Sequence, residues 1–200
     1  MKKLLVMASL FYPQKKSGGP PVSILNIIKS VKDDYELFVI SKNHEINEKE
    51  PLPGIVNGWN DLDFTKAYYF EKGKHTIKNV LTLIKQINPD VIYQNSFFSY
   101  DDVIPVLLYK KFISNEVRII IAPRGEFSSN RIMIGGLKKT MYLKALQFST
   151  LLKNVNFQGT SKDECYAISK LLDLNLNDLF NISNISILSQ KYSGLQKNQG

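Results

Sequence analysis

The sequence is poor in the residues that build metal sites and disulfide frameworks. Its 200 residues include one cysteine, Cys165, and two histidines, His44 and His75. A single cysteine excludes an intramolecular disulfide and fits a reducing compartment. So few nitrogen and sulfur ligands argue against a zinc site built from protein side chains, and we expect no metal ion.

Long hydrophobic runs are also missing. No apolar stretch approaches the roughly 20 residues that a membrane-spanning helix needs. The apolar run Leu4–Ala8 is too short for a signal peptide, and residues 11–16 offer no small-residue cleavage site. We therefore expect a cytoplasmic protein. Lys and Arg number 26 against 18 Asp and Glu, a net charge of +8, which favours nucleic acid, a phosphorylated substrate or an anionic membrane surface as partner.

The hydrophobic residues alternate between short strand-like runs and stretches with helical spacing. This alternation predicts an α/β fold, a Rossmann-like parallel sheet with helices on both faces. Short edge strands are expected at 55–59 and 67–70, around a turn at Asn60 and Asp61. The other expected strands are 3–9, 35–41, 91–93, 117–122, 155–157 and 185–188, and the expected helices are 21–31, 74–88, 101–112, 137–153 and 161–172.

The helix expected at 137–153 carries both an apolar stripe and lysines. Lys138, Lys139 and Lys153 lie roughly opposite the stripe, which we expect to face the core. The lysines fit contact with anionic headgroups or phosphate, and they fit equally a solvated helix face. The predicted stripe consists of Leu137, Met141, Ala145, Phe148 and Leu152.

The most informative stretch runs from a buried strand into a charged loop. Residues 117–122 form a largely β-branched run that is apolar apart from Arg118, and Pro123 ends it before Arg124, Gly125 and Glu126. Open α/β sheets bind ligands at the carboxyl ends of their strands. The same residues also fit a charged surface turn in which Gly125 supplies backbone freedom.

Two other polar loops follow strands of the predicted parallel sheet. Gly18 and Gly19 precede an amphipathic helix, where backbone N–H groups can approach an anion at the positive helix end. Asn95 and Ser96 follow the strand at 91–93. We expect both loops to lie on the same rim as Arg124. The alternative for Gly18 and Gly19 is a turn that merely needs glycine, and the alternative for Asn95 and Ser96 is capping of a strand end.

Five segments resemble GT-B glycosyltransferases of family 4, in particular a branch involved in surface polysaccharide assembly. The likeness covers residues 3–188. The segments that carry it are Phe11-Tyr12-Pro13, Gly18-Gly19-Pro20, Asn88-Pro89-Asp90-Val91-Ile92-Tyr93, Ala122-Pro123-Arg124-Gly125-Glu126-Phe127-Ser128 and Gln158-Gly159-Thr160-Ser161-Lys162-Asp163-Glu164.

The resemblance implies one domain of a two-domain enzyme. Residues 1–188 look like the N-terminal, acceptor-side domain, and residues 189–200 are expected to be a frayed tail. The C-terminal donor-binding domain of the family is expected to be absent. Family members transfer a sugar from a nucleotide-sugar donor to an acceptor with retained anomeric configuration, without a metal or other cofactor.

The resemblance also implies catalytic residues. Arg124 would donate hydrogen bonds to phosphate or sugar oxygens, where many family members carry a histidine instead. Glu126 would orient Arg124 or bind an acceptor hydroxyl. Gly18 and Gly19 would let the backbone approach the donor diphosphate. The alternative for Arg124 and Glu126 is a plain structural ion pair.

The remaining implied partners are the acceptor and the membrane. Asn95 and Ser96 would hydrogen-bond a glycan or lipid-linked acceptor. Lys138 and Lys139 would contact lipid headgroups or phosphate, which implies peripheral association with the inner membrane surface. A separate C-terminal half is a further possible partner. Alternatives are a non-catalytic glycan- or nucleotide-binding module and a truncated remnant. Nucleic-acid binding is disfavoured, because the aromatic residues are not interleaved with basic ones.

Overall fold

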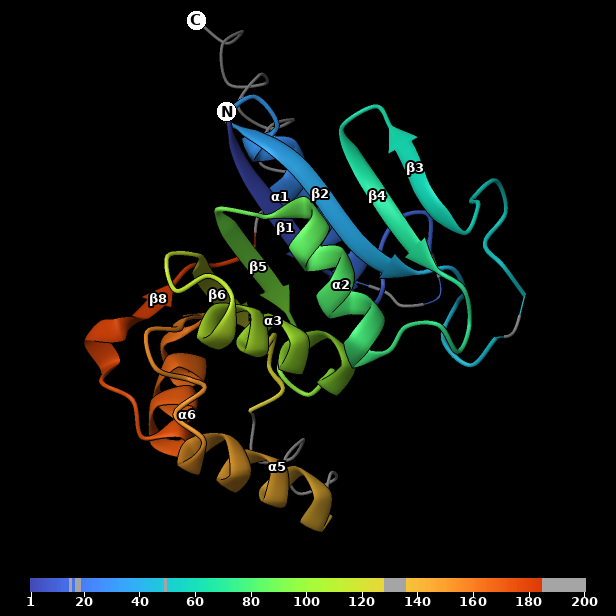
Figure 1. Ribbon diagram of the computed structural model, residues 1–200. Coiled ribbons are helices and arrows are strands. Elements are labelled where there is room, and N and C mark those ends of the chain that lie inside the picture. Colours follow the sequence, from blue (N-terminus) through green and yellow to red (C-terminus); the bar gives the residue numbers. More distant parts are fainter. Residues whose placement is uncertain (15, 17–18, 49, 128–135, 185–200) are drawn as a thin grey trace, which may run out of the picture.

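The structure, a computed structural model, describes residues 1–14, 16, 19–48, 50–127 and 136–184. In this part of the chain eight strands form one sheet, in the order β3-β4-β2-β1-β5-β6-β7-β8 (Figure 1). Every neighbouring pair is parallel except β3 and β4. The strands are β1 (Lys2–Met7), β2 (Tyr35–Lys42), β3 (Gly58–Leu62), β4 (Thr65–Phe70), β5 (Val91–Asn95), β6 (Arg118–Ala122), β7 (Asn156–Gly159) and β8 (Leu179–Asn181).

Helices cover both faces of this sheet, which confirms the predicted α/β, Rossmann-like fold. Figure 1 shows α1 behind the sheet and α2 and α3 in front of it. On the face of α1, Ile24 and Ile28 pack with Val6 and Val39 of the central strands. The helices are α1 (Gly19–Val31), α2 (Ile77–Ile87), α3 (Tyr100–Phe112), α5 (Gly136–Phe148) and α6 (Lys162–Leu172), with a short 3-10 helix at Leu176–Asp178.

The other face holds the larger core. Val80 and Ile84 of α2, Val106 of α3 and Ile168 of α6 pack there with inward-facing strand residues such as Ile119. Their spacing along each helix follows from the 3.6-residue period that the sequence shows. None of the helices in the described ranges is long and apolar enough to cross a membrane.

The edge hairpin differs from the prediction. The expected turn at Asn60 and Asp61 is wrong, because both residues lie within β3, and the turn falls at Asp63 and Phe64. The Asn60 side chain accepts a hydrogen bond from the Val56 nitrogen (3.0 Å) and donates to the Val56 oxygen (2.9 Å). Its amide therefore fixes the bend that leads into β3 instead of closing a hairpin.

The predicted core stripe of α5 is wrong as well. Leu137 and Phe148 are 76% and 86% exposed, whereas Leu143 and Leu146 are buried. Tyr142 lies on the buried side and packs against the Phe97 ring (5.6 Å between centroids). The helix is apolar on two opposite faces, and contact with this aromatic cluster selects the one that faces inward.

Two boundaries at the end of the chain also differ. The helix α5 ends at Phe148, so residues 149–154 form turns, and the expected helical positions of Leu152 and Lys153 are wrong. The strand β8 (Leu179–Asn181) was not predicted. The strand expected at 185–188 and the tail at 189–200 lie outside the described residues.

Candidate functional site

The loops that follow β5, β6 and β7 meet at one edge of the sheet. These strands are parallel neighbours, so their carboxyl ends lie side by side. Asn95 is the last residue of β5, and its Cα pairs with Ala122 at the end of β6. The predicted residues Asn95 and Arg124 are therefore brought together, and their side chains are in contact.

Arg124 is held by three hydrogen bonds. Its Nε donates to Asn95 Oδ1 at 3.2 Å, its Nη2 donates to the Tyr93 hydroxyl at 2.7 Å, and its Nη1 donates to Asn184 Oδ1. Its backbone has φ of 54°, in the left-handed region, and Gly125 follows with φ of 78°. Such a conformation is uncommon outside glycine, and it turns the chain sharply after β6.

Two linked hydrogen bonds among buried side chains hold the Arg124 guanidinium in place. The Tyr93 hydroxyl accepts from Arg124 and donates to Gln158 Oε1 at 3.0 Å. Burial raises the pKa of Tyr93, although the Arg124 charge opposes this shift, so the hydroxyl stays protonated and remains a donor. An arginine has five N–H donors, and the two that are not used by Asn95, Tyr93 and Asn184 have no partner within the described ranges.

Glu126 binds the neighbouring loop and not Arg124. Its carboxylate accepts from the Ser96 hydroxyl (2.6 Å), the Phe97 nitrogen (2.6 Å) and the Phe98 nitrogen (3.2 Å). The salt bridges in the described part of the chain are Lys16–Glu48 and His75–Asp102, so the alternative of a structural ion pair between Arg124 and Glu126 is not realised. Glu126 fixes the turn at Ser96, whose φ is 81°.

Glu164 connects a third loop to the same edge. Its carboxylate accepts from the Gly125 nitrogen and from both the nitrogen (2.7 Å) and the hydroxyl (2.6 Å) of Thr160. The Ser161 hydroxyl caps α6 by accepting from the Glu164 nitrogen at 3.1 Å. Glu164 thereby joins the start of α6 to the turn after β6.

Gly19 begins α1, and Gly18 lies outside the described residues. A Cβ added at Gly19 would meet nothing within 4 Å. Asn184 Oδ1 accepts from Ser23 of α1 (3.3 Å) as well as from Arg124. The first turns of α1 and Arg124 therefore lie on the same edge of the sheet.

The two predicted lysines lie on α5 and have different surroundings. Lys138 is exposed, and Lys139 is half-buried with its Nζ 4.7 Å from the centroid of the Phe98 ring. Because Phe98 belongs to the loop that Glu126 holds, Lys139 contacts the site loop rather than only the surface.

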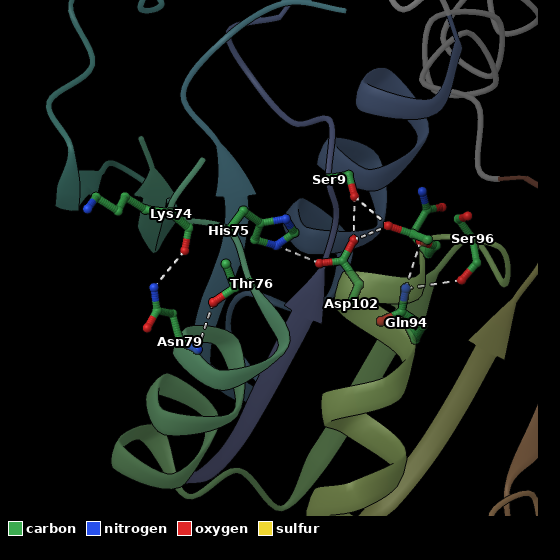
Figure 2. Close-up of polar contacts among 10 residues, drawn as sticks. Ser9, Lys74, His75, Thr76, Asn79, Gln94, Ser96 and Asp102 are labelled. Carbon is green, nitrogen blue, oxygen red and sulfur yellow. Dashed lines mark hydrogen bonds and ion pairs between the residues drawn. The ribbon is translucent and has the colours of Figure 1, made fainter. Parts of the chain in front are cut away.

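A buried contact between His75 and Asp102 lies near this edge (Figure 2). Asp102 Oδ1 is 2.8 Å from His75 Nε2, and Asp102 Oδ2 accepts from the hydroxyls of Ser9 and Ser99. Burial raises the pKa of Asp102, but His75 and the two hydroxyls outweigh burial and hold it below its usual value. The cluster joins the loop after β1 to the starts of α2 and α3. No group of three or more potential metal ligands occurs in the described part of the chain.

Sequence reasoning missed Tyr93, Gln158, Glu164 and Asn184 as parts of the site. Tyr93 and Gln158 lie in strands that the alternation of strands and helices places inside a covered sheet, and a buried polar group needs a hydrogen-bond partner. Their position in buried strands was the signal in the sequence that could have identified Tyr93 and Gln158. Glu164 and Asn184 carry no such signal, because each reaches its partner only through the tertiary fold.

No family model and no curated protein matches this chain. Among solved structures, it is similar to sucrose-phosphate synthase from Thermosynechococcus elongatus, with a TM-score of 0.55 and 7% identity over 97% of this chain and 99% of that one. It is also similar to a glycosyltransferase from Rickettsia africae, with a TM-score of 0.51 and 13% identity over 98% of this chain. The chain spans 51% of the Rickettsia protein. These likenesses show that the fold is one found in glycosyltransferases.

Proposed function

We propose that this chain is the acceptor-side domain of a glycosyltransferase. The observation that carries the proposal is Arg124. Asn95 and Tyr93 hold it at the carboxyl edge of the sheet, and two of its N–H donors have no partner among the described residues. Open α/β sheets bind ligands at this edge. The fold shared with a glycosyltransferase and with sucrose-phosphate synthase agrees with the proposal.

The proposed reaction moves a sugar from a nucleoside diphosphate to an acceptor hydroxyl, with retained anomeric configuration. The anomeric carbon loses its bond to the diphosphate oxygen and gains one to the acceptor oxygen, and the acceptor proton is taken up by the leaving diphosphate. Arg124 donates to the diphosphate as negative charge builds up on it, and Gly18 and Gly19 let the backbone approach. No metal or other cofactor takes part in this proposal.

The acceptor side of the proposed site is the Asn95–Ser96 turn. The Asn95 Oδ1 and Ser96 hydroxyl bind the acceptor, a glycan or a lipid-linked sugar of surface polysaccharide assembly. Glu126 fixes this turn through Ser96 and the backbone at Phe97, so its contribution to turnover is to position the acceptor groups. The donor base and ribose bind a second domain, since the chain spans about half of the Rickettsia glycosyltransferase.

The test is release of nucleoside diphosphate from a panel of nucleotide sugars, by residues 1–200 with and without a separately expressed C-terminal half. Transfer requires donor and acceptor in one oriented pair, so turnover is expected only with both halves. In the restored enzyme Arg124→Ala lowers turnover more than Arg124→Lys, and both leave the unfolding midpoint within a few degrees. Robust turnover by this chain alone would refute the two-domain proposal. Nucleotide-sugar binding without turnover in any combination would favour the non-catalytic module.

Peripheral membrane contact through α5 belongs to the same proposal. Leu137, Met141 and Phe148 are exposed on one face of this helix, and Lys138 and Lys144 flank that face. An apolar stripe with lysines at its border is suited to the interface of an anionic bilayer. A lipid-linked acceptor would reach the site from that surface.

A further inference from the structure

A groove of about 410 Å³ lies between α2 and the β3–β4 hairpin. The hairpin forms the edge of the sheet opposite to β8 (Figure 1). Three strands, β2, β1 and β5, separate β4 from β6 in the sheet order. The groove is therefore distinct from the edge at which Arg124 lies.

The aromatic residues Tyr68 and Phe70 line one side of the groove, and Trp59 packs against Tyr68 just outside the lining. Trp59 and Tyr68 are paired across β3 and β4, so they point to the same face of the sheet. Their ring centroids are 5.3 Å apart, with the rings nearly perpendicular. Phe70 and Leu83 of the groove lining are buried, and Trp59 is 44% exposed. The result is a fixed aromatic surface that stays partly open to solvent.

Polar side chains form the other walls. Thr82 and Gln86 are one turn apart on α2, and Glu71 and Lys74 follow the carboxyl end of β4. The Tyr68 hydroxyl, the Gln86 amide and the charged ends of Glu71 and Lys74 make no hydrogen bond or ion pair among the residues that the structure describes. The groove thus combines aromatic rings with donors and acceptors that are not yet used.

We propose that this groove binds a neutral saccharide. A pyranose has an apolar face of C–H groups with partial positive charge, which suits the negative face of an aromatic ring. Its hydroxyls both donate and accept, as amide and hydroxyl side chains do. One carboxylate and one ammonium, Glu71 and Lys74, leave the groove without a strong preference for either sign of charge. The volume is within the range of small-molecule sites.

The saccharide site does not depend on the proposed transfer reaction. It involves no residue of the carboxyl edge around Arg124, so failure of turnover leaves it untouched. Conversely, absence of saccharide binding in the groove leaves the proposed transferase activity standing. A nucleoside is the competing occupant of an aromatic groove with amides, and the experiment includes it as a probe.

Trp59 gives this site a reporter, because its ring contacts the lining residue Tyr68 and it is the single tryptophan of the sequence. The full chain is titrated with maltohexaose, cellohexaose, chitohexaose and uridine, while Trp59 emission is followed and calorimetry confirms the dissociation constants. A saturable change with at least one saccharide, and none with uridine, is expected. Gln86→Ala and Tyr68→Phe each weaken that binding about three- to tenfold, the equivalent of one lost hydrogen bond.

The matched control is Lys85→Ala, an exposed position on the same helix that does not line the groove. It is expected to bind as the unaltered chain does. Alanine is a good helix former, so Gln86→Ala keeps α2 folded, which circular dichroism checks. No saturable change with any of the three saccharides, equal affinities for Gln86→Ala, Tyr68→Phe and Lys85→Ala, or a response to uridine alone would each overturn the proposal.

Discussion

Glu126, Glu164 and Arg124 connect the loops at the carboxyl edge through side-chain hydrogen bonds. The two carboxylates accept backbone N–H groups of Phe97 and Gly125, and buried or partly buried donors of this kind are costly to leave unpaired. The guanidinium connects the ends of β5 and β6 through Asn95 and Tyr93. Individual side chains therefore define the shape of the candidate site.

Replacing Glu126 by glutamine tests this at a single position. The glutamine side chain keeps the shape of Glu126 but carries no charge. Its NH2 group also faces one of the three donors that now bind the carboxylate. We expect a loss of about 1.5–3 kcal/mol in the free energy of unfolding, the range for hydrogen bonds to charged groups. Urea titration measures it. Glu71→Gln, at an exposed carboxylate, serves as the control and should change stability by less than about 0.5 kcal/mol. Equal effects of the two variants would contradict the role given to Glu126.

Asp102 predicts a pH dependence of stability. Its pKa in the folded chain is lower than the ordinary value of 3.8, so the unfolded chain binds its proton first as the pH falls. The stabilisation is complete above the unfolded pKa and is lost as the pH falls through the folded pKa. Urea midpoints between pH 7 and pH 3 should therefore fall more steeply for the unaltered chain than for Asp102→Asn. Parallel curves for the two proteins would refute this assignment.

Among the secondary-structure elements, those with one apolar face were predictable from the sequence. The period of α2 and the apolar runs of β2 and β6 fix their positions, because a single hydrophobic face admits one orientation. The helix α5 has two apolar faces, so its orientation depends on contact with Phe97 and its neighbours, which are remote in sequence. The strand β8 is short and half exposed, so its own sequence does not mark it as a strand, and it forms because it pairs with β7.

The same reasoning explains how far the site could be predicted. The position of Asn95 and Arg124 after neighbouring parallel strands follows from the alternation of strands and helices. Their partners do not follow, because Tyr93 and Asn184 reach Arg124 from 31 and 60 residues away. Whether these residues bind a donor or an acceptor stays a prediction.

A pair of leucine variants tests the orientation of α5. Leu146 is 3% exposed, and Leu137 is on the opposite, open side. Leu146→Ala is expected to lower the free energy of unfolding by about 2–5 kcal/mol, since it leaves a cavity in the core. Leu137→Ala is expected to change it by less than about 0.5 kcal/mol. Thermal or urea unfolding measures the free energy of unfolding of both variants. A larger loss of stability for Leu137→Ala would support the stripe predicted from the sequence.

At the scale of the whole molecule, the proposed membrane contact combines a net positive charge with an exposed apolar stripe on α5. The net charge is +8, and the exposed residues Leu137, Met141 and Phe148 lie on one helix with Lys138 beside them. In the proposed membrane contact, anionic lipid attracts the positively charged molecule, and burial of these apolar side chains in the bilayer interface then retains it. Electrostatic attraction alone would be lost at high salt.

Sedimentation with vesicles separates these two contributions. We expect binding to anionic vesicles at low salt, weakened at high salt, and little binding to neutral vesicles. Phe148→Ser should reduce binding to anionic vesicles severalfold at both salt concentrations, because it removes buried apolar area. Phe112→Ser, at an exposed phenylalanine of α3 outside the stripe, is the matched control and should leave binding unchanged. Equal binding to neutral vesicles, or none at low salt, would exclude the membrane contact.

The central position of β1 has a consequence for synthesis on the ribosome. Its partners are β2, which ends at Lys42, and β5, which ends at Asn95. At the usual 5–20 residues per second, roughly 3–10 s separate the emergence of the two strands. During this interval one edge of β1, with the apolar side chains of Val6 and Met7 beside it, has no strand to pair with. Unpaired apolar edges associate with one another, so this interval is when growing chains on neighbouring ribosomes are most exposed to aggregation.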